Sequence, residues 1–487
     1  MLLKLQRPTY GLCLLLAGLL APMAQAQLPA TVVASLRAAK IPESALSAVV
    51  VPLDGGQPRL THGADLPVNP ASTIKLLTTF MALETLGPTF SWRTGLYTDG
   101  PVEGDTLRGN LYVKGGGDPK LTYERVWLLL RELRNRGIRK VTGDLVLDRS
   151  YFTLPASDKD AAPFDEEPER AYNVAADALL MNFKALRFDM DTESGGMQVR
   201  IDPAMAGVQV GSRMKLLKGD CASWSQTWAR PEVTTLPDGQ VRVMLQGGFP
   251  QGCRASRYLG LLGATDFASR LTRGLWAELG GTIAGQTREA VTPGDAKLLA
   301  EQQSPPLAEQ IRDVNKLSNN TMARTIFLTL GANQPLVGLD SQAAAAEAVR
   351  GGLARQGLDF PELVIDNGAG LSRAARISVR HLAQVLQAAQ RSNYAAEFAA
   401  SLPIVGLDGT MRTRLVGTPL AGSARIKTGT LNDVKAVAGY VRDAKGRSWG
   451  VVGILNHPRA DAGQPVLDNL LQWAATSDVT LTQVAKP

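Results

Sequence analysis

Apolar residues three and four positions apart predict helices over much of the chain. The clearest run stops at Gly87-Pro88, a pair that ends helices, and its apolar positions are Leu76, Leu77, Phe80, Met81, Leu83 and Leu86. The same spacing recurs at residues 126–136, 267–279, 307–330, 343–356 and 379–390.

Alternation of apolar and polar residues predicts strands, many of them separated by turns rich in Gly, Pro and Asp. After a first helix, strands are expected at 48–53, 107–114 and 143–148, and short β runs fill residues 183–263. The chain closes with three strands and an amphipathic helix, at 423–429, 437–441, 449–455 and 466–473. Helices packed on an antiparallel sheet make α+β the expected fold class.

The helix that stops at Gly87 begins with the pattern S-x-x-K. Ser72 lies in its expected first turn, where unpaired N–H groups and the positive dipole end favour an oxyanion. Lys75 follows three residues later, on the same face of the helix. A desolvated lysine can take the proton of a serine hydroxyl and so make the serine a nucleophile. Alone, the pattern also fits a surface helix cap with a solvated lysine.

Two further short patterns supply candidate partners. Ser318 and Asn320 form S-x-N, which stands between helical segments, and Lys427, Thr428 and Gly429 form K-T-G. The three patterns in this order are the signature of penicillin-binding proteins and serine β-lactamases. Singly, S-x-N is also a common helix cap, and K-T-G also fits a strand end that enters a turn. If the patterns share one site, the β-rich block between them is an insertion that folds separately.

The first 26 residues have the pattern of a cleaved export signal. Lys4 and Arg7 precede an apolar stretch at 12–21, which is short for a membrane span. An A-x-A site predicts cleavage after Ala26, so the mature protein is expected in the periplasm. The alternative is a retained membrane anchor.

Cys221 and Cys253 are the two cysteines that remain after this cleavage. An even pair in an exported protein predicts one disulfide. The alternative is two reduced thiols. Residues 155–170 are acidic and contain proline, and predict an exposed connector.

Composition excludes several other classes of protein. The formal net charge is +7, from 52 basic and 45 acidic residues, a mild excess that suits an anionic wall polymer among other partners. No basic and aromatic stripe indicates nucleic acid. His62, His381 and His457 lack the spacing of zinc ligands, so neither a metal nor another cofactor is expected. Since no G-x-S-x-G elbow is present, a Ser-His-Asp hydrolase is not expected either.

Beyond these motifs, the chain resembles the D-alanyl-D-alanine carboxypeptidase/endopeptidase family, the class C low-molecular-mass penicillin-binding proteins. The resemblance covers nearly the whole mature chain and is weaker at 171–176 and 183–263. Alanine stands at 369, where the family often has serine. The matching stretches are 112–119, 304–307, 313–320, 368–373, 402–410, 425–431 and 438–441.

The resemblance implies a transpeptidase-like domain of the β-lactamase type, interrupted by a nested insertion. That domain would comprise residues 27–92 and 296–487, and a second domain residues 93–182 and 264–295. Residues 183–263 would be a third, β-rich domain inside the second. The family also implies cleavage of D-Ala-D-Ala stems, or of D-Ala-diaminopimelate cross-links, through an acyl-enzyme.

These considerations define a complete set of expected site residues. The expected catalytic residues are Ser72 as nucleophile, Lys75 as base, and Ser318 and Asn320 as the groups that handle the proton and the substrate amide. For substrate binding, a carboxylate and an oxyanion are expected at Lys427, Thr428, Gly429 and Thr430.

By resemblance, two charged residues could select a diaminopimelate side chain, which ends in an ammonium and a carboxylate. Arg373 could take the carboxylate and Asp165 the ammonium. The alternatives are a structural salt bridge for Arg373 and a solvated acid, beside Glu166 and Glu167, for Asp165.

The expected partners are peptidoglycan peptides, with β-lactam antibiotics as acylating inhibitors, and a homodimer is left open. A β-lactamase or esterase on the same fold is the nearest alternative, although the chain is long for one and no motif identifies a deacylating glutamate. A non-catalytic wall-binding protein is the other alternative, and the intact set of three motifs argues against it.

Overall fold

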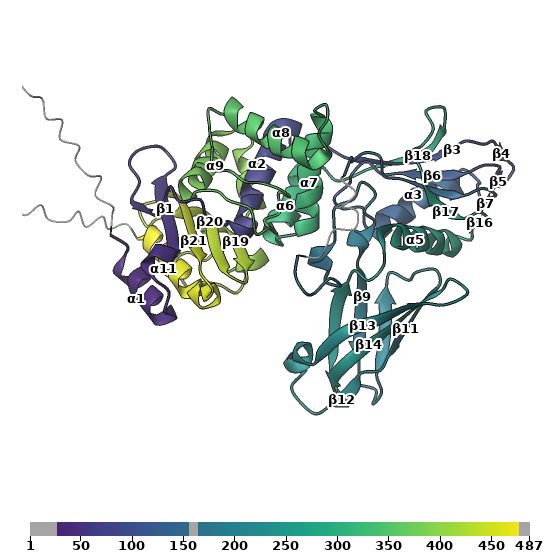
Figure 1. Cartoon of the computed structure of the whole chain (residues 1–487), viewed down its shortest axis with the longest axis horizontal. Helices are drawn as coiled ribbons and strands as arrows, with labels where there is room; N and C mark the ends of the chain where they lie inside the picture. The colour runs from purple at the N-terminus through teal and green to yellow at the C-terminus, as the bar shows by residue number, and fades with distance from the viewer. Residues whose placement is uncertain (1–26, 155–163, 477–487) are drawn as a thin grey trace, which may run out of the picture.

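A computed structural model describes residues 27–154 and 164–476 (Figure 1). The predicted signal segment and most of the predicted acidic connector, residues 155–163, lie outside the described residues. Both ends of the described chain meet in one part of the molecule, and the residues between Arg93 and Gln303 form an arm beside it (Figure 1).

One antiparallel sheet joins the two ends of the chain, with its strands in the order β19-β20-β21-β1-β2. The N-terminal strands are β1 (Leu46–Pro52) and β2 (Leu60–His62). The C-terminal strands are β19 (Arg425–Leu431), β20 (Val434–Arg442) and β21 (Ser448–Asn456). Because β19 is the last strand in this order, one of its edges is open beyond the sheet.

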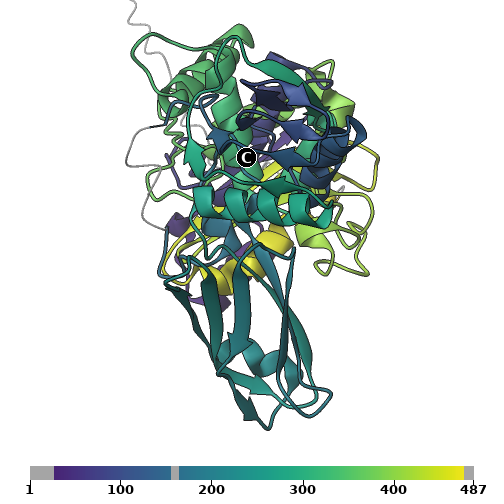
Figure 2. The same ribbon diagram turned by 90° about the vertical axis from the view of Figure 1, so that its right-hand side faces the viewer.

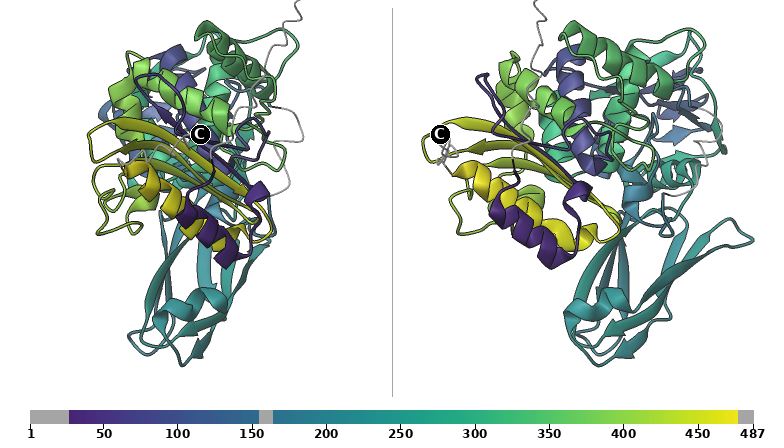
Figure 3. Two further views of the ribbon diagram at one scale, coloured as in Figure 1. Left: turned by 90° about the vertical axis from the view of Figure 1, so that its left-hand side faces the viewer. Right: turned by 60° about the vertical axis from the view of Figure 1, so that its left-hand side comes forward.

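Helices cover both faces of this sheet (Figure 3). α1 (Ala30–Ala39) and α11 (Gln464–Ala475) pack on one face in a shared apolar cluster. The other face holds a larger cluster around α2 (Lys75–Leu86), whose residues from Lys75 to Leu83 are buried. The helices around α2 are α6 (Leu307–Lys316), α7 (Asn320–Asn333), α8 (Ser341–Arg355), α9 (Val379–Arg391) and α10 (Ala395–Ser401). The predicted α+β fold class is confirmed.

Two mixed sheets form the middle of the arm, with α3 (Tyr123–Asn135) and α5 (Ala264–Glu278) packed against them. The larger has the order β17-β8-β6-β3-β18: β17 (Thr287–Glu289), β8 (Leu145–Asp148), β6 (Leu111–Lys114), β3 (Arg93–Thr98) and β18 (Lys297–Gln303). The smaller has the order β16-β7-β5-β4: β16 (Thr282–Ile283), β7 (Lys140–Val141), β5 (Thr106–Leu107) and β4 (Val102–Glu103).

The β-rich lobe, residues 186–259, projects from the arm below α5 (Figure 2). Its first sheet contains β10 (Gln198–Asp202), β9 (Leu186–Asp191) and β15 (Arg254–Leu259). Its second contains β11 (Val208–Ser212), β12 (Lys215–Leu217), β13 (Trp228–Thr235) and β14 (Val241–Pro250). One apolar cluster continues from the arm into this lobe, including Leu271 of α5 and Phe188 of β9. The predicted domain boundaries stay a prediction.

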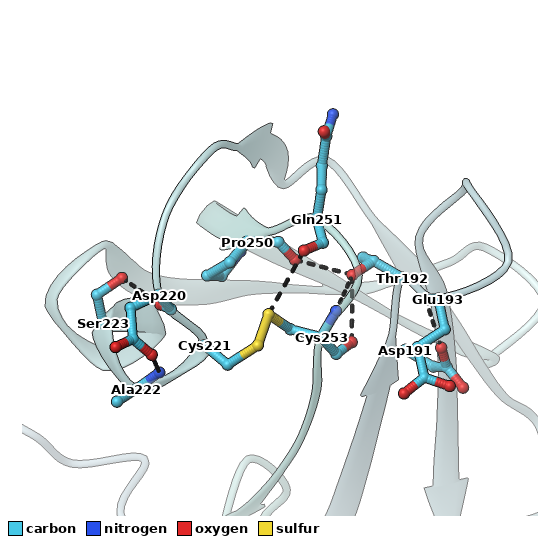
Figure 4. Close-up of a disulfide and its surroundings, with 10 residues drawn as sticks. All are labelled: Asp191, Thr192, Glu193, Asp220, Cys221, Ala222, Ser223, Pro250, Gln251 and Cys253. Atoms are coloured by element: carbon cyan, nitrogen blue, oxygen red, sulfur yellow. Dashed lines mark hydrogen bonds between the residues drawn. A yellow bond between two sulfur atoms is a disulfide. The ribbon is translucent and has the colours of Figure 1, made fainter.

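The predicted disulfide is confirmed (Figure 4). It joins Cys221, in a short 3-10 turn, to Cys253, which directly precedes β15, with 5.5 Å between the two Cα atoms. Thr192 supports this junction, because its hydroxyl accepts from the N–H of Cys253 at 3.0 Å and donates to the carbonyl of Pro250 at 2.8 Å (Figure 4).

One predicted strand is wrong, and the exposed connector is wrong in part. The strand expected at 107–114 is two strands, β5 and β6, in different sheets, and between them Gly109 approaches Gly100 so closely that a Cβ on Gly109 would lie 2.7 Å from the Gly100 nitrogen. The helical spacing over 307–330 belongs to two helices, α6 and α7, and the expected position of the S-x-N motif between helical segments is confirmed. In the described part of the expected exposed connector, Glu166 and Glu167 are exposed as predicted, whereas Glu169 is buried, with 6% of its surface exposed.

Candidate active site

Ser72 lies in a 3-10 turn, Ala71–Ile74, that leads directly into α2. The predicted first turn of the helix is therefore tighter than an α-helical turn. Asn69 holds the entry to the turn, since its side-chain oxygen accepts from the N–H of Ala71 at 2.9 Å. Ala71 has a φ of +44°, a left-handed conformation that is uncommon for a residue with a side chain. The turn presents Ser72 at the N-terminal end of the buried helix α2.

Lys75 is fully buried below Ser72. Its Nζ lies 2.9 Å from the Ser72 hydroxyl oxygen and 2.7 Å from the Asn320 side-chain oxygen. A third contact, of 2.5 Å, is with the main-chain carbonyl of Ala369. All three neighbours are uncharged, and among the described residues no carboxylate lies within ion-pair distance of Lys75. The Lys75 amine therefore lies among polar groups, and no negative charge in the described chain is close enough to balance its positive charge.

The carbonyl of Ala369 is a contact that the motifs did not predict. Asn367 shapes the loop that presents it, because its side-chain oxygen accepts from the N–H groups of Ala369 and Gly370. Gly370 has a φ of +77°, and a Cβ there would lie 1.9 Å from the carbonyl oxygen of Ala71. This backbone contact depends on the loop, so the alanine at 369 does not remove it.

The S-x-N motif occupies the break between α6 and α7. Asn319 caps α7, since its side-chain oxygen accepts from the N–H of Met322 at 3.0 Å. The sequence allowed a helix cap as an alternative role for this motif, and Asn319, its middle residue, forms that cap. Ser318 has a φ of +57°, and its hydroxyl oxygen lies 2.9 Å from the Lys427 Nζ. Asn320 points to Lys75. The break in the helix therefore directs the two outer residues of the motif to the two lysines.

Lys427 and Gly429 lie on β19, beside the Ser72 turn. The side chain of Lys427 is buried and also donates to the carbonyl of Thr428 at 2.7 Å. A Cβ on Gly429 would lie 3.1 Å from the nitrogen of Ser72, so glycine permits this close approach of strand and turn. The hydroxyl of Thr428 donates to the hydroxyl of Thr410 at 2.8 Å. Thr410 is a further site residue that the motifs did not identify, although it lies in the matching stretch 402–410.

The open edge of β19 borders this site. The N–H of Ile426 donates to the carbonyl of Pro403, away from the neighbouring strand β20. Backbone N–H groups alternate between the two edges of an antiparallel strand. The N–H groups of Thr428 and Thr430 therefore face the same open edge as that of Ile426. An extended peptide could pair with this edge, beyond the point that Pro403 covers.

Burial lowers the pKa of both lysines. For Lys75 the causes are desolvation first, then the positive charges of Lys427 and Arg324, and together they hold its pKa well below 10.5. Desolvation lowers the pKa of Lys427 to about 7. Near neutral pH, one amine can then be neutral while the other still carries a proton.

Arg373 contacts the residue that precedes Asp165 in the chain. The Arg373 guanidinium lies 5.0 Å from the ring centre of Phe164, the residue before Asp165. Arg373 also lies 3.9 Å from Asp433, and both side chains of this pair are more than half exposed. Such an exposed pair contributes little stability, so the salt bridge leaves the Arg373 guanidinium accessible.

Asp165 is held by three donors. The hydroxyl of Tyr172 and the side-chain amide of Asn173 each donate to it at 2.7 Å, and the N–H of Glu167 donates at 3.0 Å. Burial alone would raise the pKa of Asp165, but these hydrogen bonds outweigh it and lower the pKa. Asp165 is therefore ionised at neutral pH.

The histidines have contacts outside this site. His381 lies 2.6 Å from Glu362, His62 contacts the carbonyl of Glu43, and His457 accepts from the N–H of Arg459. Within residues 27–154 and 164–476, no group of three or more His, Cys, Asp or Glu could hold a metal ion. None of the helices in these ranges is long and apolar enough to cross a membrane.

This fold and site define a serine peptidase of the penicillin-binding protein class. A family model for the D-Ala-D-Ala carboxypeptidase 3 (S13) family matches residues 29–477. The chain belongs to this family, which confirms the family and the enzyme class that the sequence predicted.

Sequence similarity to known proteins covers most of the chain. It is 28% identical over 396 residues to the D-alanyl-D-alanine carboxypeptidase DacB of Haemophilus influenzae, covering 79% of this chain and 80% of the relative. It is 29% identical over 423 residues to a D-alanyl-D-alanine carboxypeptidase of Actinomadura sp. (strain R39), covering 83% and 76%. The crystal structure of penicillin binding protein 4 (dacB) from Haemophilus influenzae has the same fold, with a TM-score of 0.74 at 24% identity, over 91% of this chain and 99% of that one.

Proposed function

We propose that this protein is an exported peptidoglycan DD-peptidase that forms an acyl-enzyme on Ser72. The observation that carries the proposal is the meeting of three distant motifs in one buried network. Lys75 contacts Ser72 and Asn320, and Lys427 contacts Ser318. A chance match of three short patterns gives no reason for such contacts.

Lys75 is the general base in this proposal. A neutral amine has two N–H donors and one lone pair. The Asn320 side-chain oxygen and the Ala369 carbonyl can only accept, so they take the two N–H donors. The lone pair is then left for the third neighbour, the Ser72 hydroxyl. The lowered pKa of Lys75 supports this protonation state. Ser72 gives its proton to Lys75 as its oxygen attacks the carbonyl of the penultimate D-Ala.

Ser318 completes the proton path to the leaving amine. Lys427 in its protonated form donates to the Ser318 hydroxyl oxygen, so Ser318 can give its own hydrogen to the leaving nitrogen and take the Lys427 proton in its place. Asn320 bridges Lys75 and the amide of the substrate. Lys75 therefore begins acylation neutral and ends it protonated, while Lys427 begins protonated and ends neutral.

The substrate lies along β19. Lys427 and Thr428 hold its terminal carboxylate by charge-assisted hydrogen bonds. The N–H groups of Ser72 and Thr430 bind the oxyanion that forms on the attacked carbonyl. The direction of the Thr430 N–H towards the open edge of the strand supports this role, as does the approach of Gly429 to the nitrogen of Ser72.

Arg373 and Asp165 select a diaminopimelate side chain in the same complex. Asp165 takes the ammonium group and Arg373 the carboxylate. The contact of Arg373 with Phe164, the residue before Asp165, and the ionised state of Asp165 support this pairing of opposite charges. A peptide with such a side chain occurs at D-Ala-diaminopimelate cross-links, so both carboxypeptidase and endopeptidase cleavage are proposed.

The proposed location is the periplasm, after cleavage of the export signal behind Ala26. The disulfide between Cys221 and Cys253 supports export, because such bonds persist in oxidising compartments. The proposed partners are peptidoglycan peptides and acylating β-lactams, and a homodimer remains a prediction.

Peptide hydrolysis and penicillin labelling test this function together. The mature protein should release D-Ala from a D-Ala-D-Ala peptide and bind fluorescent penicillin covalently, and Ser72→Ala should abolish both. Ser91→Ala, a serine outside the three motifs, is the matched control and should retain both. Stoichiometric labelling of Ser72→Ala would refute the nucleophile. Rapid penicillin turnover with no peptide hydrolysis would indicate a β-lactamase instead.

A further inference from the structure

The β-rich lobe is joined to the segment that carries Asp165. Arg170, in that segment, forms an antiparallel β-bridge with Leu259 at the end of β15. Next to it, the N–H of Gly260 donates to the carbonyl of Glu169 at 2.8 Å. The segment around Asp165 therefore continues the edge of a sheet in the lobe, and the position of the lobe constrains it.

Arg257, close to this junction of the two segments, extends its side chain to the segment that carries Asp165. It lies on β15 and is 9% exposed. Its guanidinium lies 4.4 Å from the ring centre of Trp228 and 5.5 Å from that of Trp224. One of its terminal nitrogens lies 3.6 Å from a carboxylate oxygen of Glu167. The two tryptophans hold the positive charge of Arg257 beside this acid.

The disulfide fixes one of these tryptophans. Trp224 lies in the turn Cys221–Gln226, and Cys221 is bonded to Cys253, directly before the strand that carries Arg257 (Figure 4). The side-chain oxygen of Asp220 caps the same turn by accepting from the N–H of Ala222 at 2.9 Å. The bond therefore ties the turn with Trp224 to the strand with Arg257.

Two carboxylates share the hydroxyl of Tyr172. It lies 2.7 Å from Asp165 and 3.1 Å from Glu167. A phenol has a single hydrogen to donate, so the acids compete for it. Arg170 and Arg257 each lie 3.6 Å from the same carboxylate oxygen of Glu167, and together they partly neutralise it and weaken it as an acceptor. The hydrogen then goes to Asp165, at the shorter distance, and holds that carboxylate in place together with Asn173.

We propose that the β-rich lobe orients Asp165 for ammonium binding, with Arg257 as the positioning residue that acts through Glu167 and Tyr172. This inference rests on the proposed role of Asp165 in selecting diaminopimelate. Without Arg257, Glu167 keeps one of these two cationic neighbours, the more exposed Arg170. Glu167 then competes more strongly for the Tyr172 hydrogen, and Asp165 loses part of one of the contacts that fix it. The lobe then supports substrate selection from outside the catalytic cleft, and the acylation chemistry at Ser72 does not depend on it.

A selectivity ratio tests this role. Two D-Ala-D-Ala peptides are compared, one with diaminopimelate at the third residue and one with the distal amine of that residue acetylated, and the ratio of their kcat/KM values is measured. Arg257→Met should lower the ratio about threefold or more, which is within the usual range of coupling between neighbouring residues. The penicillin acylation rate should not change. Arg213→Met is the matched control, because Arg213 pairs with Glu232 elsewhere in the lobe, and it should retain the full ratio.

Two more variants show whether Arg257 acts by this route. In an Asp165→Ala background, Arg257→Met should have no further effect on the ratio. Glu167→Gln removes the competing charge at a half-exposed position, so it should keep the ratio and protect it against loss of Arg257. A fall of the ratio in Glu167→Gln alone would overturn the competition for Tyr172.

The outcomes separate this inference from the function on which it rests. If Asp165→Ala lowers the ratio and Arg257→Met does not, the positioning role of the lobe is overturned and the function stands. If Asp165→Ala leaves the ratio unchanged, the ammonium role of Asp165 in the proposed function is overturned. A loss of penicillin acylation in Arg257→Met equal to the loss of peptide cleavage would assign Arg257 to the stability of the fold.

Discussion

Replacing Lys427 with methionine should stabilise the protein at neutral pH while it removes activity. Methionine has nearly the same length and carries no charge. Lys427 is fully buried, and desolvation lowers its pKa from 10.5 to about 7. At about 1.4 kcal/mol per pKa unit, this difference corresponds to about 5 kcal/mol of unfavourable burial for the charged amine.

The direction in which stability changes with pH follows from the number of protons bound in the folded and unfolded states. Because the pKa is lower in the folded than in the unfolded protein, the folded state binds fewer protons between pH 7 and 10.5, and stability rises with pH in that window. About 4 kcal/mol of the penalty is present at pH 7 and about 1 kcal/mol at pH 10. The variant also loses hydrogen bonds to Ser318 and Thr428, each contributing about 1 kcal/mol.

Lys427→Met should therefore be more stable than the wild type by about 2 kcal/mol at pH 7 and less stable by about 1 kcal/mol at pH 10. Urea unfolding at both values of pH measures this change of sign. Lys114→Met, at an exposed position on β6, is the control and should show no such change. If Lys427→Met were less stable than the wild type by the same amount at pH 7 and at pH 10, burial of the charged Lys427 amine would carry no net penalty, which would refute this prediction.

Three further predictions concern the cap, the lobe and the pH profile. Asn319→Ala should lower stability by about 1 kcal/mol through loss of the α7 cap and slow penicillin acylation; an unchanged melting curve would contradict the cap. Replacing both Cys221 and Cys253 by serine should lower stability by about 3–4 kcal/mol, since the bond closes a loop between residues 32 apart; hydrogen exchange should increase in the β-rich lobe, and equal exchange there would be the contrary result. As Lys427 loses its proton above about pH 7, kcat/KM should fall for a peptide with an amidated terminus through the proton path at Ser318, and should fall further for the corresponding peptide with a free terminal carboxylate; equal falls for the two peptides would remove Lys427 from carboxylate binding.

Elements with a strong local pattern were predictable from the sequence. The helix α2 stands out because its apolar spacing and its stop at Gly87 are both local. The three C-terminal strands alternate clearly and are joined by short turns. Local patterns do not identify which distant strands pair. The pairing of β1 with β21, at opposite ends of the chain, could therefore not be predicted.

Local patterns also failed where tertiary contacts determine the backbone. Residues 107–114 alternate as one strand, yet the close approach of Gly109 to Gly100 divides them between two sheets. The apolar spacing of 307–330 continues through the S-x-N motif, because Leu317 fits the pattern although it is exposed. The motif itself breaks the helix there, with Asn319 as the cap of the second half.

In the candidate site, too, some residues could be predicted from the sequence and others could not. The motif residues could be predicted because their chemistry is in their side chains. The Ala369 carbonyl could not, since a main-chain acceptor has no signature in sequence and depends on the fold of its loop. The role of Arg257 depends on packing between β15 and residues 165–172, which are about 90 residues away in sequence.

Mass spectrometry of the acylated protein tests the central claim most directly. After exposure to benzylpenicillin, the intact mass should rise by one penicillin molecule, and peptide mapping should locate the adduct on Ser72. Ser72→Ala should gain no mass. An adduct on any other residue, or the same mass increase in Ser72→Ala, would contradict the assignment of Ser72 as the nucleophile.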